Sequence, residues 1–164
     1  MLIRHAKAVS PYGDYKDIDR PLTSRGAEEA KGMANWLREK LALLSEFTPL
    51  FLTSTALRTQ ETAAIFSETL SYPLKNIQPH SQLYLPQKDI FYEVIEDVVD
   101  SINTLFVFSH NNGITDFANS LTNNRIDVIP PCGVAVFKVE TTAWKNIRNT
   151  TKEWLWFKTP DLLG

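Results

Sequence analysis

An uninterrupted apolar run, Leu105-Phe106-Val107-Phe108, is the feature of the sequence that most restricts its fold. Its residue types favour β-structure. Neighbouring side chains of a strand point to opposite faces, so an all-apolar strand must be buried on both. Strands of this kind are typical of parallel sheets covered by helices on both sides. The run therefore predicts a central strand of an α/β sheet.

The rest of the chain alternates between short apolar runs and segments with helical spacing. Because alternating strands and helices form parallel sheets, we expect a mostly parallel sheet covered on both faces. No helical segment separates the last two predicted strands, which indicates at least one antiparallel neighbour. We expect strands near residues 1–3, 50–53, 77–83, 105–108, 134–139 and 154–158, and helices near 24–41 (capped by Thr23 or Ser24), 55–70, 89–99 and 113–121.

Length and charge exclude several classes of protein. The 164 residues are expected to form a single domain over residues 1–164. A net charge of -2 argues against nucleic acid as the main partner. No apolar run approaches the roughly 20 residues of a membrane span, and the first ten residues lack an apolar signal core. With a single cysteine as well, we expect a reduced, cytoplasmic protein; whether residues precede Met1 stays open.

Chemically distinctive side chains follow three of the predicted strands. Arg4 and His5 follow the first strand, Arg58 follows the second, and His110 follows the run at 105–108. Because parallel strands end at the same edge of a sheet, these residues are expected to meet there. His110 taken alone is equally consistent with a structural histidine at a strand end.

Arg58 is the most informative of these residues. It lies in the first turn of a predicted helix, where the positive end of the helix dipole disfavours a cation. A pair with Glu61 one turn later is one explanation. A bound anion is a better one, because a helix start also offers free N–H groups. No glycine-rich phosphate loop is present in the sequence, so arginine side chains would have to hold such an anion.

Histidine between arginines suits phosphoryl transfer. Guanidinium charges disfavour protonation of imidazole and so keep it nucleophilic near neutral pH. The arginines also neutralise the oxygens of a phosphoryl group, and a second histidine can donate to one of them. His5, His80 and His110 show no metal-ligand spacing. The sequence therefore predicts a phosphoryl-transfer site that needs neither a metal nor another cofactor.

Four motifs, in order along the chain, are similar to those of the histidine phosphatase superfamily, also called phosphoglycerate mutase-like. They resemble most closely its short SixA-type branch, the phosphohistidine phosphatases. The motifs are LIRHAKA at 2–8, DRPLTSRG at 19–26, STALRTQETA at 54–63 and FSHN at 108–111.

The resemblance implies a three-layer α/β/α sandwich with one antiparallel strand. It also implies roles for individual residues. His5 would be the phosphorylated nucleophile, Arg4 and Arg58 would clamp the phosphate, His110 would be the partner histidine and Arg20 a further phosphate ligand. The substrate would be a phosphorylated protein carrying phosphohistidine, or a small phosphorylated metabolite.

One departure from the larger members bears on the substrate. They place an acidic proton donor after the third strand, and here Asp89 is the nearest acid, which is better explained as a cap or first-turn residue of the next helix. An alkoxide leaving group needs such a donor more than imidazole does. We therefore expect a phosphohistidine phosphatase. A general small-molecule phosphomonoesterase and a non-catalytic phosphate-binding module are the alternatives.

Overall fold

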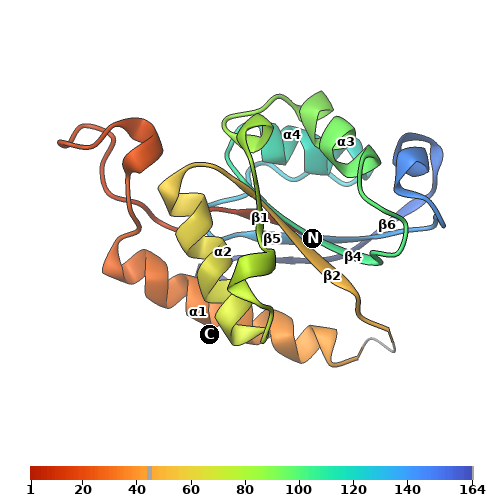
Figure 1. Cartoon of the computed structure of the whole chain (residues 1–164), viewed down its shortest axis with the longest axis horizontal. Coiled ribbons are helices and arrows are strands. Elements are labelled where there is room, and N and C mark those ends of the chain that lie inside the picture. The colour runs from red at the N-terminus through yellow and green to blue at the C-terminus, as the bar shows by residue number, and fades with distance from the viewer. Residues whose placement is uncertain (44–45, 164) are drawn as a thin grey trace.

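The computed structural model describes residues 1–43 and 46–163, in which six strands form one sheet in the order β3-β2-β4-β1-β5-β6 (Figure 1). Neighbouring strands are parallel from β3 to β1, whereas β5 is antiparallel to both β1 and β6. The predicted antiparallel neighbour is thus confirmed. The strands are β1 (Leu2–Arg4), β2 (Pro49–Ser54), β3 (Gln78–His80), β4 (Thr104–Ser109), β5 (Val134–Val139) and β6 (Lys152–Lys158).

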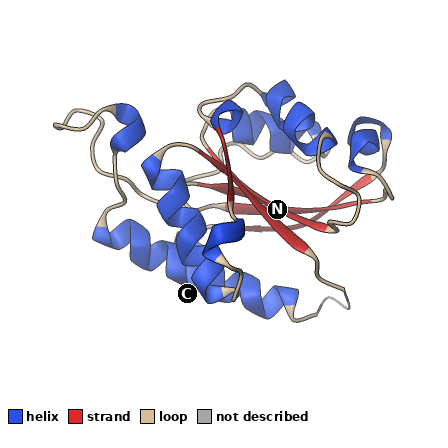
Figure 2. Ribbon diagram, in the orientation of Figure 1, coloured by secondary structure: helices blue, strands red, loops and turns tan. Residues whose placement is uncertain are grey.

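Helices cover both faces of this sheet and complete three layers (Figures 1 and 2). One face is covered by α1 (Ser24–Leu41) and α2 (Leu57–Thr69), and the other by α3 (Lys88–Glu96) and α4 (Gly113–Ser120). The α1 helix has the predicted bounds, and the side chain of Thr23 caps it by accepting a hydrogen bond from the N–H of Gly26. The mixed three-layer α/β fold expected from the sequence is confirmed.

Two hydrophobic cores lie on the two faces of the sheet, and β4 contributes to both. Leu105 and Val107 pack with α3 and α4, whereas Phe106 and Phe108 pack with α1 and α2. All four side chains are buried, as the apolar run predicted. The strand that carries His110 at its end is therefore fixed from both sides.

The third strand differs from its prediction. We expected one strand over 77–83, but β3 spans only Gln78–His80, and Ser81–Leu83 forms a short 3-10 helix. The strand lies at the edge of the sheet and contains Pro79, which has no N–H to donate to a further neighbour. The strand ends level with Ser54, at the carboxyl edge of the sheet, so the residues that follow it lie at that edge.

Two glycines let helix starts approach the loops of that edge closely. A Cβ on Gly26 in α1 would lie 2.1 Å from the carbonyl oxygen of Lys7. A Cβ on Gly113 in α4 would lie 1.9 Å from the carbonyl oxygen of Pro86. Since real Cβ atoms do not approach so closely, only glycine allows these contacts, which set the two helices against the loops after β1 and β3.

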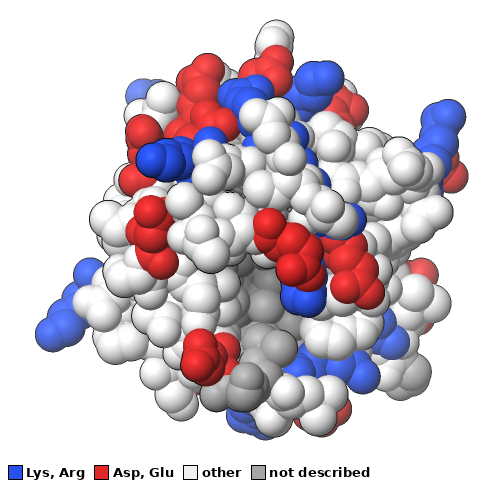
Figure 3. Space-filling model, turned by 90° about the vertical axis from the view of Figure 1, so that its right-hand side faces the viewer, with Lys and Arg blue, Asp and Glu red and all other residues white. Residues whose placement is uncertain are grey.

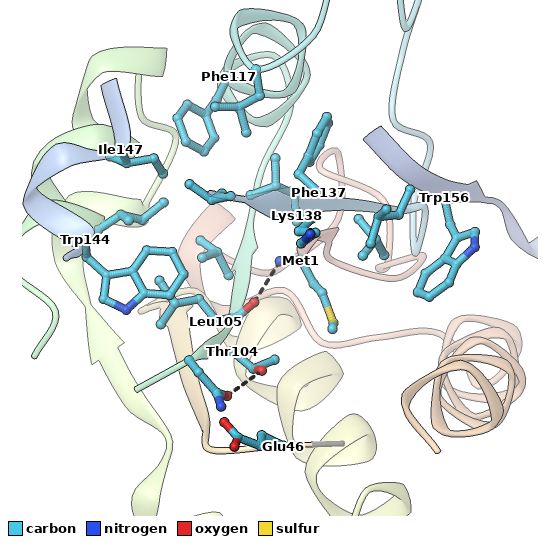
Figure 4. A pocket seen from close by; sticks show the side chains of 18 residues that line it. Met1, Glu46, Thr104, Leu105, Phe117, Phe137, Lys138, Trp144, Ile147 and Trp156 are labelled. Carbon is cyan, nitrogen blue, oxygen red and sulfur yellow. Dashed lines mark hydrogen bonds between the residues drawn. The ribbon is translucent and has the colours of Figure 1, made fainter. Parts of the chain in front are cut away.

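A cavity of about 330 Å³ lies at the opposite, amino-terminal edge of the sheet (Figure 4). The strand β1 begins only at Leu2, which pairs with Val107 of β4 and Ala135 of β5. Beyond Met1, therefore, β1 no longer separates the start of β4 from the second half of β5. The amino group of Met1 donates to the carbonyl of Leu105 at 2.7 Å. The lining is mostly apolar, with Phe117, Phe137 and Trp144 among its residues (Figure 4). Acidic and basic side chains are interspersed over this side of the molecule (Figure 3). The cavity is separate from the residues that the sequence predicted to act.

Across residues 1–43 and 46–163, none of the helices has the length and apolar character that crossing a membrane requires.

Candidate active site

The carboxyl edge of the sheet brings together the predicted side chains. Arg4 ends β1 and His5 follows it, His110 follows β4, and Arg58 occupies the first turn of α2. The ring centroids of His5 and His110 lie 5.2 Å apart. His110 and Arg58 are each 1% exposed and His5 is 9% exposed. The three strand ends thus form one cluster in which His5, His110 and Arg58 are buried and Arg4 is half-buried.

The surroundings of His5 fix its tautomer and its charge. Its backbone is held from two sides, since its N–H donates to Ser109 and its carbonyl accepts from Cys132. Nδ1 lies 2.8 Å from the carbonyl oxygen of Ala6, which can only accept, so Nδ1 carries the proton and Nε2 has a free lone pair. Burial, together with the charges of the nearby arginines, lowers the pKa of His5 to about 3. His5 is therefore neutral, with Nε2 available as a nucleophile.

His110 is held between a donor and an acceptor. Nη2 of Arg58 donates to its Nδ1 at 3.2 Å, so its proton is on Nε2 and is donated to Oγ of Ser54 at 2.7 Å. Burial and the neighbouring His5 and Arg58 lower its pKa to about 3. Both ring nitrogens of this neutral histidine are thus engaged. The predicted donation to a phosphoryl oxygen requires the phosphate to take over one of these partners.

The partner of Arg58 differs from the pair considered from the sequence. Among the described residues Glu61 makes no hydrogen bond or ion pair with Arg58, and it accepts instead from the backbone N–H of Leu22 at 2.7 Å. The Asp17 carboxylate lies 3.0 Å from Nη2 of Arg58, and the Asp17 carbonyl accepts from Nη1. An anion does lie on Arg58, as the helix-dipole argument required, but the chain itself supplies it.

Arg20 reaches the same region, where Asp17 holds it. Its Nε and Nη2 donate to Oδ1 of Asp17 at 3.0 and 2.8 Å, and its Nη1 donates to the carbonyl of Val9 at 2.8 Å. All three nitrogens of the guanidinium group are therefore engaged within the loop before α1. The expected phosphate ligand is near the site but is bound to a carboxylate.

Sequence reasoning missed Asp17 and Tyr84. The Tyr84 hydroxyl donates to Oδ2 of Asp17 at 2.6 Å, and its ring packs edge-on against His110 with centroids 5.4 Å apart. Burial alone would raise the pKa of Asp17, but hydrogen bonds from Tyr84, Arg20 and Arg58 outweigh it and hold that pKa well below its usual range. Asp17 is therefore a carboxylate at any pH at which the protein would work.

Asp89, the nearest acid after the third strand, does not join the site. It lies in the first turn of α3, 63% exposed, and its carboxylate is 3.8 Å from Arg148. The reading of Asp89 as a residue of the helix start is thus confirmed. Tyr84 is the side chain that the segment after β3 delivers to the histidines.

Two buried arginine nitrogens beside the histidines have no hydrogen-bond partner among the described residues, Nε of Arg4 and Nε of Arg58. Arg4 is otherwise held by a bond from its Nη1 to the carbonyl of Ile129 at 3.0 Å. Burial and the charge of Arg58 lower the pKa of Arg4. Because an unpaired buried donor is costly, these N–H groups indicate a place for an acceptor, and their charge favours an anion.

Thr62 of α2 ties this helix to the loop after β1. Its hydroxyl donates to the carbonyl of Arg58 at 2.7 Å and accepts from the N–H of Ala6 at 3.0 Å. Thr62 therefore links the segment that carries His5 to the helix that carries Arg58.

The donor types present also bear on metals. Within residues 1–43 and 46–163, no group of three or more His, Cys, Asp and Glu side chains is arranged to hold a metal ion. The positive charge at the site comes from Arg4, Arg20 and Arg58. Two neutral histidines surrounded by arginines at the carboxyl edge of an α/β sheet define a site for a phosphate-like anion.

Comparison with known proteins identifies the family. The family model described as histidine phosphatase superfamily (branch 1) matches residues 1–83, which include Arg4, His5, Arg20 and Arg58. The uncharacterized protein Rv1276c of Mycobacterium tuberculosis (strain ATCC 25618 / H37Rv) is 31% identical over 147 residues, covering 84% of this chain and 87% of that protein. The chain belongs to the histidine phosphatase superfamily, as the four motifs indicated.

Solved structures share the fold over nearly the whole chain. The protein histidine phosphatase SixA complexed with tungstate has a TM-score of 0.81 at 19% identity, covering 99% of this chain and 97% of that one. The mycobacterial glucosyl-3-phosphoglycerate phosphatase Rv2419c complexed with VO3 has a TM-score of 0.66 at 11% identity, covering 94% of this chain and 96% of that one. Family membership supports phosphatase chemistry at a histidine, and both solved structures show the same fold as this chain.

Proposed function

We propose that this protein is a metal-independent phosphatase that acts through a phosphohistidine on His5 and removes phosphate from phosphohistidine carried by another protein. The observation that carries the proposal is the pair of unpartnered, buried Nε groups of Arg4 and Arg58 beside a neutral His5. A phosphoryl group bound to Nε2 of His5 would supply the acceptor oxygens that these donors lack.

The reaction proceeds in two displacements. The Nε2 lone pair of His5 attacks phosphorus, the bond from phosphorus to the substrate's nitrogen breaks, and that nitrogen leaves with the bonding pair and takes up a proton. Water then attacks the phosphorylated His5, which returns to neutral imidazole as inorganic phosphate leaves. Arg4 and Arg58 hold the oxygens of the phosphoryl group in both steps.

The leaving group supports a phosphoramidate substrate. Asp89 is exposed and paired with Arg148, and Asp17 is held as a carboxylate, so neither acid is arranged to protonate an alkoxide. Imidazole is a better leaving group and depends less on such a donor.

A small phosphorylated metabolite is the second candidate substrate. The glucosyl-3-phosphoglycerate phosphatase with the same fold acts, by its name, on a small ester. Tyr84, which lies beside His110, would then be the nearest hydroxyl to assist an alkoxide. This candidate predicts turnover of small esters and none of phosphohistidine.

The test is phosphate release from a phosphorylated histidine-phosphotransfer domain, with a chelator present. Wild type, His5→Ala and the matched control His80→Ala are compared, and His5 is examined for acid-labile phosphate. We expect wild type and His80→Ala to release phosphate and His5→Ala to be inactive. Full activity of His5→Ala would show that His5 is not the nucleophile. Turnover of small esters alone would establish the metabolite phosphatase, and phosphate binding without any turnover would establish a binding module.

A further inference from the structure

The Asp17 carboxylate accepts hydrogen bonds from two of the arginines that a phosphate at this site would also need. It accepts hydrogen bonds from Arg20, Arg58 and Tyr84, and its two oxygens take four of them in all. Three charged or polar side chains from separate parts of the chain thus converge on one carboxylate. The contacts resemble those that arginines and a hydroxyl would make to the oxygens of a phosphoryl group.

Arg20 shows most clearly that the carboxylate and a phosphate compete. Each of its three nitrogens already donates, two to Asp17 and one to the carbonyl of Val9. These bonds use three of its five N–H groups, and both nitrogens of its Nε–Nη2 edge already donate to Asp17. Arg58 is different, since its Nε keeps an unpartnered N–H among the described residues while Nη2 contacts Asp17. Arg58 can therefore bind phosphate and Asp17 together, whereas a phosphate that takes the Nε–Nη2 edge of Arg20 must displace Asp17 from it.

Asp17 is placed so that such an exchange is possible. It begins a short 3-10 helix, Asp17–Asp19, within the loop between β1 and α1, and its side chain is 42% exposed. Arg20 is only 13% exposed at the side chain, so the carboxylate and not the arginine is the more accessible partner. Water already reaches the carboxylate, and a rotation of the Asp17 side chain would free the Nε–Nη2 edge of Arg20.

We propose that Asp17 is an internal anion that competes with phosphate for Arg20, so that the carboxylate holds the arginines in the free protein and weakens the binding of free phosphate. This inference rests on the proposed function, because it needs phosphate to bind beside His5. Competition would favour release of the product, since phosphate leaves Arg20 to a carboxylate that is already tethered nearby. It would also select against substrates with extra negative charge next to the phosphoryl group, because Asp17 lies at the same mouth of the site.

The test is the affinity of inorganic phosphate, measured by calorimetric titration with wild type, Asp17→Asn and Asp17→Ala. Removing one of two like charges that share a site is expected to strengthen phosphate binding about tenfold in both variants. The matched control is Asp19→Asn, which changes the same charge two residues away. Asp19 is exposed, and its side chain makes no hydrogen bond or ion pair within the described part of the chain. This control is expected to bind phosphate within twofold of wild type.

The outcomes separate this inference from the function on which it rests. Weaker binding in Asp17→Asn, and weaker still in Asp17→Ala, would mean that the carboxylate only positions the arginines, and would overturn the competition. Equal affinity in wild type and both variants, or equal strengthening in Asp19→Asn, would overturn it as well. If the wild type and all variants fail to bind phosphate, the proposed function fails together with the inference. Thermal unfolding of each variant shows that the comparison is made between folded proteins.

Discussion

The two buried histidines predict a specific dependence of stability on pH. His5 and His110 are neutral in the folded protein because burial and nearby arginines lower both pKa values to about 3. In the unfolded chain a histidine has a pKa of about 6.5. Between these values the unfolded state binds protons that the folded state does not, so the free energy of unfolding falls as the pH is lowered from about 7 toward 3.

The size of this effect at pH 4.5 depends little on the exact folded values. At two pH units below its unfolded pKa, each histidine that stays neutral in the fold loses about 2.7 kcal/mol of stability. The pair therefore accounts for a loss of about 5 kcal/mol between pH 7 and pH 4.5. That is a large part of the total stability of an ordinary domain.

Urea unfolding followed by tryptophan fluorescence measures this loss, in a buffer without phosphate because an anion bound to the native site would mask it. His5→Asn and His110→Asn each remove one of the two groups, so each variant should lose about 2.7 kcal/mol less than wild type over the same pH range. Carboxylates and the Met1 amino group, whose pKa burial lowers to about 5, contribute equally to wild type and variants and cancel in the comparison. An equal pH dependence in all three proteins would show that the histidines titrate normally in the fold, and the electrostatic account of the nucleophile would be wrong.

Three further substitutions test the positioning of the site. Arg58→Lys replaces a planar guanidinium group by a single ammonium group and should reduce kcat/KM for phosphate release about 10²–10³-fold. A reduction of less than tenfold would argue against a role of Arg58 in holding the phosphoryl group. Gly113→Ala places a Cβ 1.9 Å from a backbone oxygen and should lower the free energy of unfolding in urea by about 1–3 kcal/mol. Gly13→Ala is the control: its Cβ has its nearest atom at 3.6 Å, so the free energy of unfolding should fall by less than in Gly113→Ala. Thr62→Val leaves the buried N–H of Ala6 without its acceptor and should lower the free energy of unfolding by about 1–3 kcal/mol. The amide of Ala6 should then exchange its hydrogen faster than in wild type, and an unchanged exchange rate would contradict the prediction.

Local patterns in the sequence were sufficient for most of the fold. The periodic apolar positions of α1 and the capping hydroxyl of Thr23 act within one segment, and the helix has its predicted bounds. The apolar run of β4 is likewise buried on both faces. The third strand was predicted too long because it was extended to the next apolar residue, Leu83, whereas pairing with β2 ends at His80. Where a strand ends depends on its neighbour, which a local pattern does not contain.

The candidate site could be predicted to a similar extent, and for the same reason. His5, Arg58 and His110 meet because strand order places three strand ends at one edge, a general property of parallel sheets. Tyr84 was missed because its contact with Asp17 joins residues 67 positions apart through two irregular loops. Asp17 did leave a local signal, since it precedes Arg20 by three residues and a 3-10 turn aligns side chains at that spacing.

Arg58 shows how such a local argument can be right about chemistry and incomplete about its source. A cation in the first turn of a helix requires an anion, and the structure places the Asp17 carboxylate there at 3.0 Å. That carboxylate does not satisfy the whole guanidinium group, because Nε stays buried without a partner among the described residues. An arginine present only to pair with Asp17 would not need to be buried beside two neutral histidines, where every charge costs free energy. The remaining donor therefore favours a second anion at this site, as the proposed phosphorylation of His5 requires.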